Sequence, residues 1–151
     1  RGTTGWDRAP GPWWRNILAP RQAVTKKAIP PPDRPQAIGT YAQAIRAGNV
    51  IYLSGQTGLD PATMQLVDGF DAQAHRVFRN LQALAGAAGA TLDDAVKLTV
   101  FLTDLVHFAR LNVIMSQYLK EPYPARSAVG VSALPRGALV EIEATLVRRE
   151  G

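Results

Sequence analysis

The chain has 151 residues, of which 46% are hydrophobic and 19% are charged, a composition typical of one globular domain with a sizeable core. It contains no cysteine, which excludes disulfides, iron–sulfur clusters and cysteine nucleophiles. Its two histidines, His75 and His107, lie far apart, and no group of His, Asp and Glu has metal-ligand spacing, so we expect neither a metal nor a cofactor. No apolar run approaches the ~20 residues that cross a bilayer, so we expect no membrane partner.

The net charge of +5 comes from the N-terminal part of the chain. Residues 1–27 contain six basic residues and one acidic residue, whereas the rest of the chain contains eleven of each. A protein that binds duplex nucleic acid usually has a basic face that neutralises phosphates. We therefore expect that nucleic acid is not a partner of the folded part.

Residues 1–36 are predicted to be a disordered N-terminal extension, because they hold seven of the eleven prolines and all three tryptophans. The run Pro30–Pro32 enforces extended backbone and blocks a helix. We interpret the extension as a tail or as the remnant of a targeting segment. The alternative is an arm in which Trp13 and Trp14 dock on a neighbouring subunit. We expect a cytoplasmic protein, or an organellar one if residues 1–27 are such a remnant.

Residues 37–151 are predicted to form one folded domain. Two β-rich runs flank the turn pair Gly48–Asn49, which indicates a hairpin. Apolar residues at helical spacing predict two helices, and Gly89 is well placed to end the first of them. The predicted elements are strands 41–47 and 50–54, helix 70–88, strand 95–103, helix 108–119, and strands 126–133 and 139–147, the last two joined through Pro135-Arg136-Gly137.

This β-β-α-β-α-β-β order favours an α+β fold, with one mixed sheet and two helices packed on one face. The run Val50–Leu53 is apolar without alternation, so both faces of that strand favour burial. In strand 95–103, Val96 is expected to share a face with Leu98, while Phe101 points to the other face. Because two helices cover only one face, we expect the other face to meet a partner subunit.

The C-terminal part of the chain carries the candidate site. Arg126 lies alone in an uncharged, strand-forming segment, and Glu141 and Glu143 alternate with apolar residues fifteen residues later. Arginine grips a carboxylate through two parallel hydrogen bonds, and a carboxylate on a neighbouring strand can activate water. The pattern favours a site where water attacks a small anionic substrate. It does not separate Glu141 from Glu143, and a solvated outer face explains both equally well.

The same segment resembles a known family. Four pieces match in order: 37–44, 54–56, 96–104, and a C-terminal signature that joins Pro124-Ala125-Arg126-Ser127-Ala128-Val129, Leu134-Pro135 and Val140-Glu141-Ile142-Glu143-Ala144. Over roughly residues 35–149, the chain resembles the RidA (YjgF) family of reactive enamine/imine deaminases. The resemblance implies a chorismate-mutase-like fold and a homotrimer with sites at the subunit interfaces.

The resemblance also implies roles for individual residues. Arg126 would bind the carboxylate of a 2-imino acid, and Glu141 would orient the attacking water. The residues implied to contact substrate are Arg126, Tyr41, Ser54, Gly55, Asn112 and Ala128. Without the resemblance, each of these is an ordinary strand, turn or surface residue. The chain departs from the family where many members have Pro, Ser, Cys or an acidic residue: here these positions are Thr40, Ala42, Ala128 and Gly130.

The implied function is hydrolytic deamination of 2-imino acids of the 2-iminopropanoate and 2-iminobutanoate class, a reaction of metabolite damage control that yields 2-oxo acids and ammonia. The changes at Ala42 and Ala128 leave an alternative open, a non-catalytic trimer that binds small ligands or other proteins. A further alternative is RNA cleavage with inhibition of translation, an activity attributed to some family members. The balanced charge after residue 27 and the lack of a histidine pair argue against it.

Overall fold

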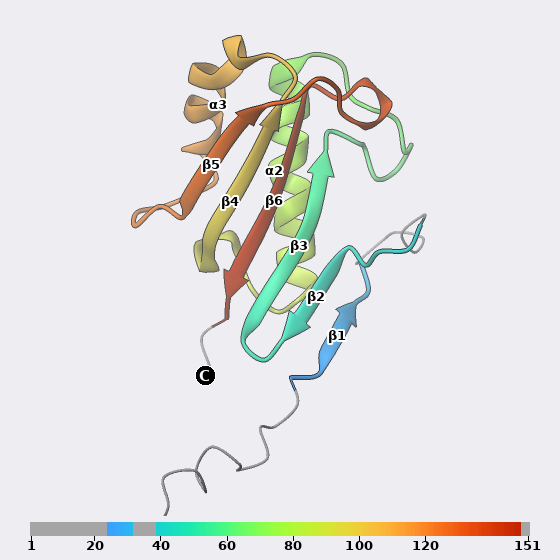
Figure 1. Ribbon diagram of the computed structural model, residues 1–151, viewed down its shortest axis with the longest axis vertical. Coiled ribbons are helices and arrows are strands. Elements are labelled where there is room, and N and C mark those ends of the chain that lie inside the picture. The colour runs from blue at the N-terminus through green and yellow to red at the C-terminus, as the bar shows by residue number, and fades with distance from the viewer. Residues whose placement is uncertain (1–23, 32–38, 149–151) are drawn as a thin grey trace, which may run out of the picture.

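The computed structural model describes residues 24–31 and 39–148. In this part of the chain, one mixed sheet of six strands has the order β1-β2-β3-β6-β4-β5, and two helices lie on one of its faces (Figure 1). The predicted α+β fold is therefore confirmed. The strands are β1 (Lys26–Ile29), β2 (Ala44–Ala47), β3 (Val50–Thr57), β4 (Ala95–Leu102), β5 (Ala125–Gly130) and β6 (Val140–Val147), and the helices are α2 (Phe70–Ala87) and α3 (Phe108–Met115).

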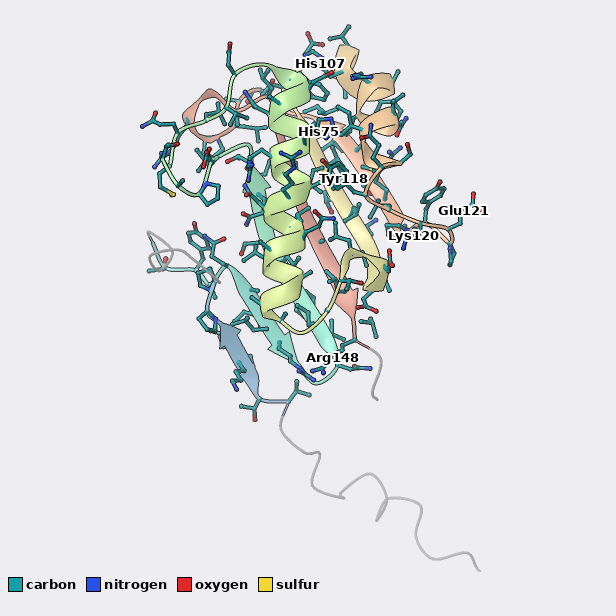
Figure 2. The ribbon with its side chains drawn as sticks, turned by 180° about the vertical axis from the view of Figure 1, so that it is seen from behind. His75, His107, Tyr118, Lys120, Glu121 and Arg148 are labelled. Atoms are coloured by element: carbon teal, nitrogen blue, oxygen red, sulfur yellow. The ribbon has the colours of Figure 1, made fainter. Side chains whose placement is uncertain are left out.

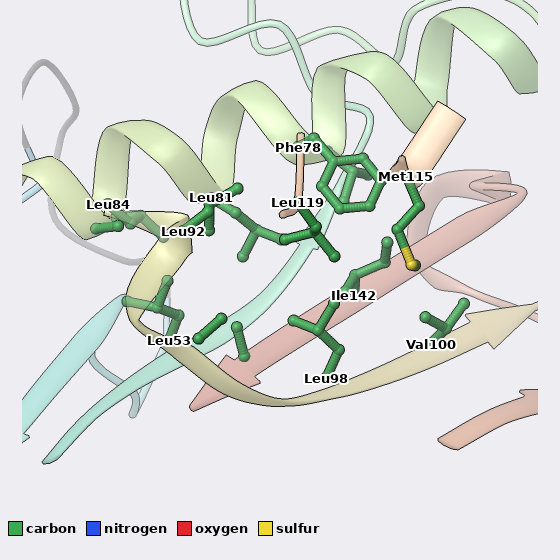
Figure 3. Packing of buried hydrophobic residues seen from close by; sticks show 14 of the residues in the cluster. Leu53, Phe78, Leu81, Leu84, Leu92, Leu98, Val100, Met115, Leu119 and Ile142 are labelled. Atoms are coloured by element: carbon green, nitrogen blue, oxygen red, sulfur yellow. The ribbon is translucent and has the colours of Figure 1, made fainter. Parts of the chain in front are cut away.

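Helix α2 covers the centre of the sheet. Its apolar residues recur at helical spacing and are fully buried at Ala74, Val77, Phe78 and Leu81. Phe78 and Leu81 pack over Leu98 and Ile142 of the sheet (Figure 3). Burial of each large side chain contributes roughly 1.5–3 kcal/mol. The helix ends close to the predicted position, because Gly89 follows with φ of 73°, a conformation that glycine adopts without strain.

Helix α3 is shorter than predicted. It ends at Met115 rather than Leu119, and the next residues form tighter turns in which Tyr118 N–H donates to the carbonyl of Met115. The Ser116 hydroxyl donates to the carbonyl of Val113 at 2.8 Å, a local bond that competes with the helical ladder. Leu119 is nevertheless buried, so the apolar periodicity correctly identified a core residue beyond the end of the helix.

Strand β1 lies within the segment predicted to be a disordered extension, and that prediction is wrong for Lys26–Ile29. The strand pairs antiparallel with β2, from Lys26 opposite Ala47 to Ile29 opposite Ala44. Two lysines at a sheet edge discourage pairing with another chain, but they also hide the alternation by which a strand is recognised. The predicted docking of Trp13 and Trp14 lies outside the described residues.

A register shift between Ala95 and Lys97 changes the face of one predicted side chain. Leu98, Val100 and Leu102 point towards the helices and are buried, but Val96 is 46% exposed. The expectation that Val96 shares their face is therefore wrong, because a bulge breaks the two-residue period of the strand.

The sheet face opposite the helices, here called the open face, is turned towards the viewer in Figure 1. Among the described residues, no helix or strand covers it, and Tyr52 is 52% exposed there. Burial of this side of β3 was expected from the run Val50–Leu53, and the single chain does not provide it. No helix in the described ranges is long and apolar enough to cross a membrane.

Candidate functional site

Three side chains of helix α3 hold Arg126. Its Nη1 donates a hydrogen bond to Oδ1 of Asn112 and lies 3.7 Å from Sδ of Met115. Its Cζ lies 5.0 Å from the centroid of the Phe108 ring. Residues 108, 112 and 115 recur at helical spacing and so share one side of α3. The sequence-based prediction named Asn112 but missed Phe108 and Met115, although this spacing around Asn112 was a signal for them.

Arg126 borders a hollow of about 450 Å³ on the helix side of the sheet. The hollow is lined by Leu98, Asn112, Met115, Ser116, Leu119, Tyr123, Pro124 and Arg126. Ala128 lies two residues further along β5, half-buried against the core and on the same face as Arg126. The predicted residues Arg126, Asn112 and Ala128 therefore come together, and we call this group the arginine half.

Glu141 lies on the open face and is half-buried. Burial raises the pKa of its carboxyl group above the ordinary value, and the negative charge of Glu143 raises it further. Glu143 is exposed. The two carboxylates, which the sequence pattern left equivalent, therefore differ in burial.

A bulge in β3 lies beside Glu141. The pairing with β6 shifts between Leu53 and Gln56, so Ser54 and Gly55 together occupy the space of one residue. A Cβ added at Gly55 would stand 2.9 Å from Cδ of Glu141 and closer still to its Oε1. Gly55 therefore leaves the space that the carboxylate occupies. We call Ser54, Gly55 and Glu141 the glutamate half.

Ser54 links the bulge to the segment that precedes β2. Its hydroxyl donates to the carbonyl of Ala42 at 2.7 Å, and its N–H donates to the carbonyl of Gln43 at 2.9 Å. Tyr41 is the residue before Ala42, and it is 53% exposed. The predicted residue Tyr41 therefore adjoins the glutamate half through its chain neighbour. A hollow of about 270 Å³ on this face is lined in part by Ala42, Ser54 and Glu143.

Within one chain, the two halves do not meet. In the sheet, β4 separates β5 from β6, so the expectation that Arg126 and Glu141 lie on neighbouring strands is wrong. Arg126 pairs with Leu98 and shares its face, the helix side, whereas Glu141 pairs with Phe101 and points to the open face. The connection through Pro135–Gly137 is long enough for β6 to return on the far side of β4.

Both histidines contact other aromatic side chains. Nδ1 of His75 lies 2.6 Å from the hydroxyl of Tyr118, and the His107 ring stacks on Phe70 with 4.1 Å between centroids. Figure 2, seen from the helix side, shows His75 on α2 beside Tyr118. Among residues 24–31 and 39–148, no group of three His, Cys, Asp or Glu side chains is arranged to hold a metal ion.

Comparisons with known proteins find relatives that match most of the chain. The family model described as endoribonuclease L-PSP matches residues 31–148. The chain is 49% identical over 127 residues to protein DfrA of Myxococcus xanthus, which covers 82% of this chain and 97% of that protein. It is 42% identical over 123 residues to a 2-iminobutanoate/2-iminopropanoate deaminase of Dermatophagoides farinae, covering 81% and 96%. The crystal structure of RidA from an Antarctic Psychrobacter matches with a TM-score of 0.77 and 53% identity, covering 80% of this chain and 98% of that one.

The chain therefore belongs to the RidA (YjgF) family, as its sequence motifs indicated. The family fold is the mixed sheet with two helices described above. The relatives carry different names, among them deaminase and DfrA, so membership alone does not assign a reaction.

Proposed function

We propose that the protein hydrolyses 2-imino acids of the 2-iminopropanoate and 2-iminobutanoate class to 2-oxo acids and ammonia. One observation carries this proposal: Arg126 is held by α3 through Nη1. Among the described residues, no hydrogen bond engages its Nε or Nη2. That pair of N–H groups forms the edge that binds a carboxylate through two parallel bonds. The deaminase name of relatives at about 42% identity supports the same reaction.

In the proposed mechanism, Arg126 binds the substrate carboxylate and fixes the imine carbon beside a water molecule. The Glu141 carboxylate accepts a proton from that water as its oxygen bonds to the imine carbon. Glu141 then donates this proton to the imine nitrogen, giving a neutral carbinolamine. In the collapse, Glu141 accepts the hydroxyl proton of the carbinolamine and passes it to the nitrogen as the C–N bond breaks, which releases ammonia and the 2-oxo acid. Imines are electrophilic, so orientation supplies much of the acceleration.

We further propose that copies of the chain assemble into a homotrimer, and that each site joins the arginine half of one subunit to the glutamate half of another. The support is geometric: Arg126 and Glu141 face opposite sides of one sheet, and a second subunit is required to bring such side chains together. Exposed apolar side chains on the open face, such as Tyr52 and Val129, are suited to burial in such an interface. The number three follows from the resemblance to the family.

The test is to supply 2-iminobutanoate with a threonine dehydratase and to follow the release of 2-oxobutanoate. The wild-type protein should accelerate release in proportion to its concentration, and Glu141→Gln should abolish most of the acceleration. Glu143→Gln is the matched control, since it removes a carboxylate from the same strand and face. Saturable binding of 2-oxobutanoate without turnover would refute the deaminase and identify a ligand-binding protein instead.

A further inference from the structure

We propose that Phe108 is a positioning residue for Arg126, and that its ring sets the plane in which the guanidinium presents its Nε and Nη2 edge to the substrate. This inference rests on the proposed function, since it assumes that Arg126 binds a carboxylate. It assigns a purpose to an aromatic side chain that neither the sequence motifs nor the core of the fold explains.

The contacts of Arg126 divide into two kinds. Oδ1 of Asn112 and Sδ of Met115 both contact Nη1, so they fix one corner of the guanidinium and leave its Nε and Nη2 without a hydrogen bond among the described residues. Cζ, the central atom of the guanidinium, lies over the Phe108 ring, 5.0 Å from its centroid. A cation above an aromatic face is attracted by the ring quadrupole. These contacts hold the group at Nη1 and at Cζ, and two held points restrict the orientation of its plane.

The exposure of Phe108 argues against a packing role. The side chain is 38% exposed and does not belong to the buried cluster that α2 and the sheet form. The next apolar residue on the same side of α3, Leu111, is fully buried and serves the core. An exposed aromatic residue at the first position of a helix, directly against the guanidinium, is better explained by its contact with Arg126.

The start of α3, which carries Phe108, is attached to the start of α2. His107, the residue before it, stacks on Phe70 at the start of α2, with 4.1 Å between centroids and 6° between planes. Within the first turn of α3, Arg110 donates hydrogen bonds to Asp71: Nη2 and Nε lie 2.6 Å and 2.9 Å from Oδ2, and Nε lies 3.1 Å from Oδ1. These contacts join the first turns of the two helices, so Phe108 is carried on a fixed element.

An aromatic face also preserves the charge that the substrate needs. A carboxylate beside Arg126 would hold the guanidinium firmly but would compete with the carboxylate of the substrate. Among the described residues, the ion pairs join Arg110 to Asp71 and Lys120 to Asp93, and neither involves Arg126. Phe108 therefore holds the cation without neutralising it.

The experiment compares Phe108→Leu with Phe108→Tyr and the wild type. Loss of the ring should raise KM for 2-iminobutanoate, and Kd for 2-oxobutanoate, by roughly three- to tenfold, with kcat changed by less than about twofold. Tyrosine keeps the aromatic face, so Phe108→Tyr should stay near the wild type. Val113→Ala, an exposed apolar change on the same helix, is the control and should leave both constants unchanged.

A double-mutant cycle with Arg126→Ala separates positioning from folding. In the Arg126→Ala background, Phe108→Leu should weaken 2-oxobutanoate binding no further, because the group that it positions is gone. An equal loss with and without Arg126, or wild-type affinity of Phe108→Leu, would overturn the proposal. A wild-type protein that binds 2-oxobutanoate but lacks turnover would refute the deaminase instead, and the cycle measured by binding would still decide the role of Phe108.

Discussion

Gly55 and Glu141 occupy complementary space across β3 and β6: a Cβ at Gly55 would stand 2.9 Å from Cδ of Glu141 and 3.1 Å from its Cγ. The relationship occurs at the bulge, where Ser54 and Gly55 together lie opposite a single residue of β6. The bulge therefore determines where the carboxylate lies, and hence where a water activated by it would be held.

Replacing Gly55 with alanine tests this relationship. The nearest atoms belong to the end of a flexible side chain, so the protein should fold and the carboxylate should move instead. Displacement of a catalytic group by about 1 Å costs on the order of 100-fold, so we expect Gly55→Ala to lower kcat by about ten- to 100-fold. Steady-state kinetics with 2-iminobutanoate measure the loss of kcat, and thermal denaturation measures whether the variant is still folded.

Gly86→Ala is the matched control. Gly86 is exposed within α2, and a Cβ there meets no atom within 4 Å. Alanine favours the helix by roughly 0.5–1 kcal/mol, so this variant should be slightly more stable and fully active. Wild-type kcat in Gly55→Ala would show that the position of the Glu141 carboxylate is not critical.

The pH dependence of the reaction should report the raised pKa of Glu141. If Glu141 acts as the base, the acid limb of kcat/KM lies above the ordinary pKa of glutamic acid, because the carboxyl must lose its proton. Glu143 contributes to the raised pKa, so Glu143→Gln should move the acid limb to lower pH. The pH profiles of kcat/KM for the wild type and Glu143→Gln are compared over about pH 4 to 9. Ionisation of the substrate affects both profiles equally, so it does not contribute to the difference between them. If the acid limb of the Glu143→Gln profile does not move, a group other than Glu141 determines its position.

The raised pKa of Glu141 also affects the stability of the folded protein. Glu141 holds its proton more tightly in the folded protein than in the unfolded chain, because burial disfavours the charged form. The folded state therefore loses stability as pH rises from the ordinary pKa of the group through the raised one. Glu141→Gln removes this loss, so the difference in Tm between variant and wild type should increase in favour of the variant as pH rises through that window. A difference independent of pH would contradict the raised pKa.

Loss of Arg126 should weaken recognition of the substrate carboxylate. Each charge-assisted hydrogen bond contributes roughly 1.5–3 kcal/mol, so Arg126→Ala should lower kcat/KM at least about tenfold. Arg126→Lys keeps the charge but lacks the planar fork and should recover only part of the loss. Arg79→Ala, which removes an exposed arginine of α2, is the control. Turnover of fresh 2-iminopropanoate at the wild-type rate by Arg126→Ala would exclude Arg126 from the site.

The elements that the sequence predicted well are those with strong local signals. The helical spacing of Val77, Phe78 and Leu81 defined α2, and Gly89 marked its end. The pair Gly48–Asn49 marked the hairpin, in which Ala47 lies opposite Val50. In these cases the residues that determine the structure lie close together in sequence, so the pattern is sufficient.

The features that the sequence did not reveal depend on pairing between distant segments. Strand β1 is stabilised by its backbone bonds to β2, and its lysines show no apolar face. The bulge that exposes Val96 exists only relative to β6. The insertion of β6 between β3 and β4, which leaves β4 between the strands of Arg126 and Glu141, is a property of topology that local spacing does not encode.

If the site is shared between subunits, mixing two inactive variants in one oligomer should restore part of the activity. Arg126→Ala chains retain the glutamate half, and Glu141→Gln chains retain the arginine half. If each site takes one half from each of two neighbours, oligomers co-expressed at equal levels contain intact pairs at about a quarter of their sites. We therefore expect about a quarter of wild-type kcat/KM from the mixture, well above either variant alone.

The control mixes Arg126→Ala with the double variant Arg126→Ala/Glu141→Gln. These oligomers contain no intact Arg126, so no arrangement of subunits restores a site, and activity should stay at the level of Arg126→Ala. A mixture of the two single variants that remains equally inactive would refute the shared site. The opposite faces of Arg126 and Glu141 would then mean that they do not act on the same substrate molecule.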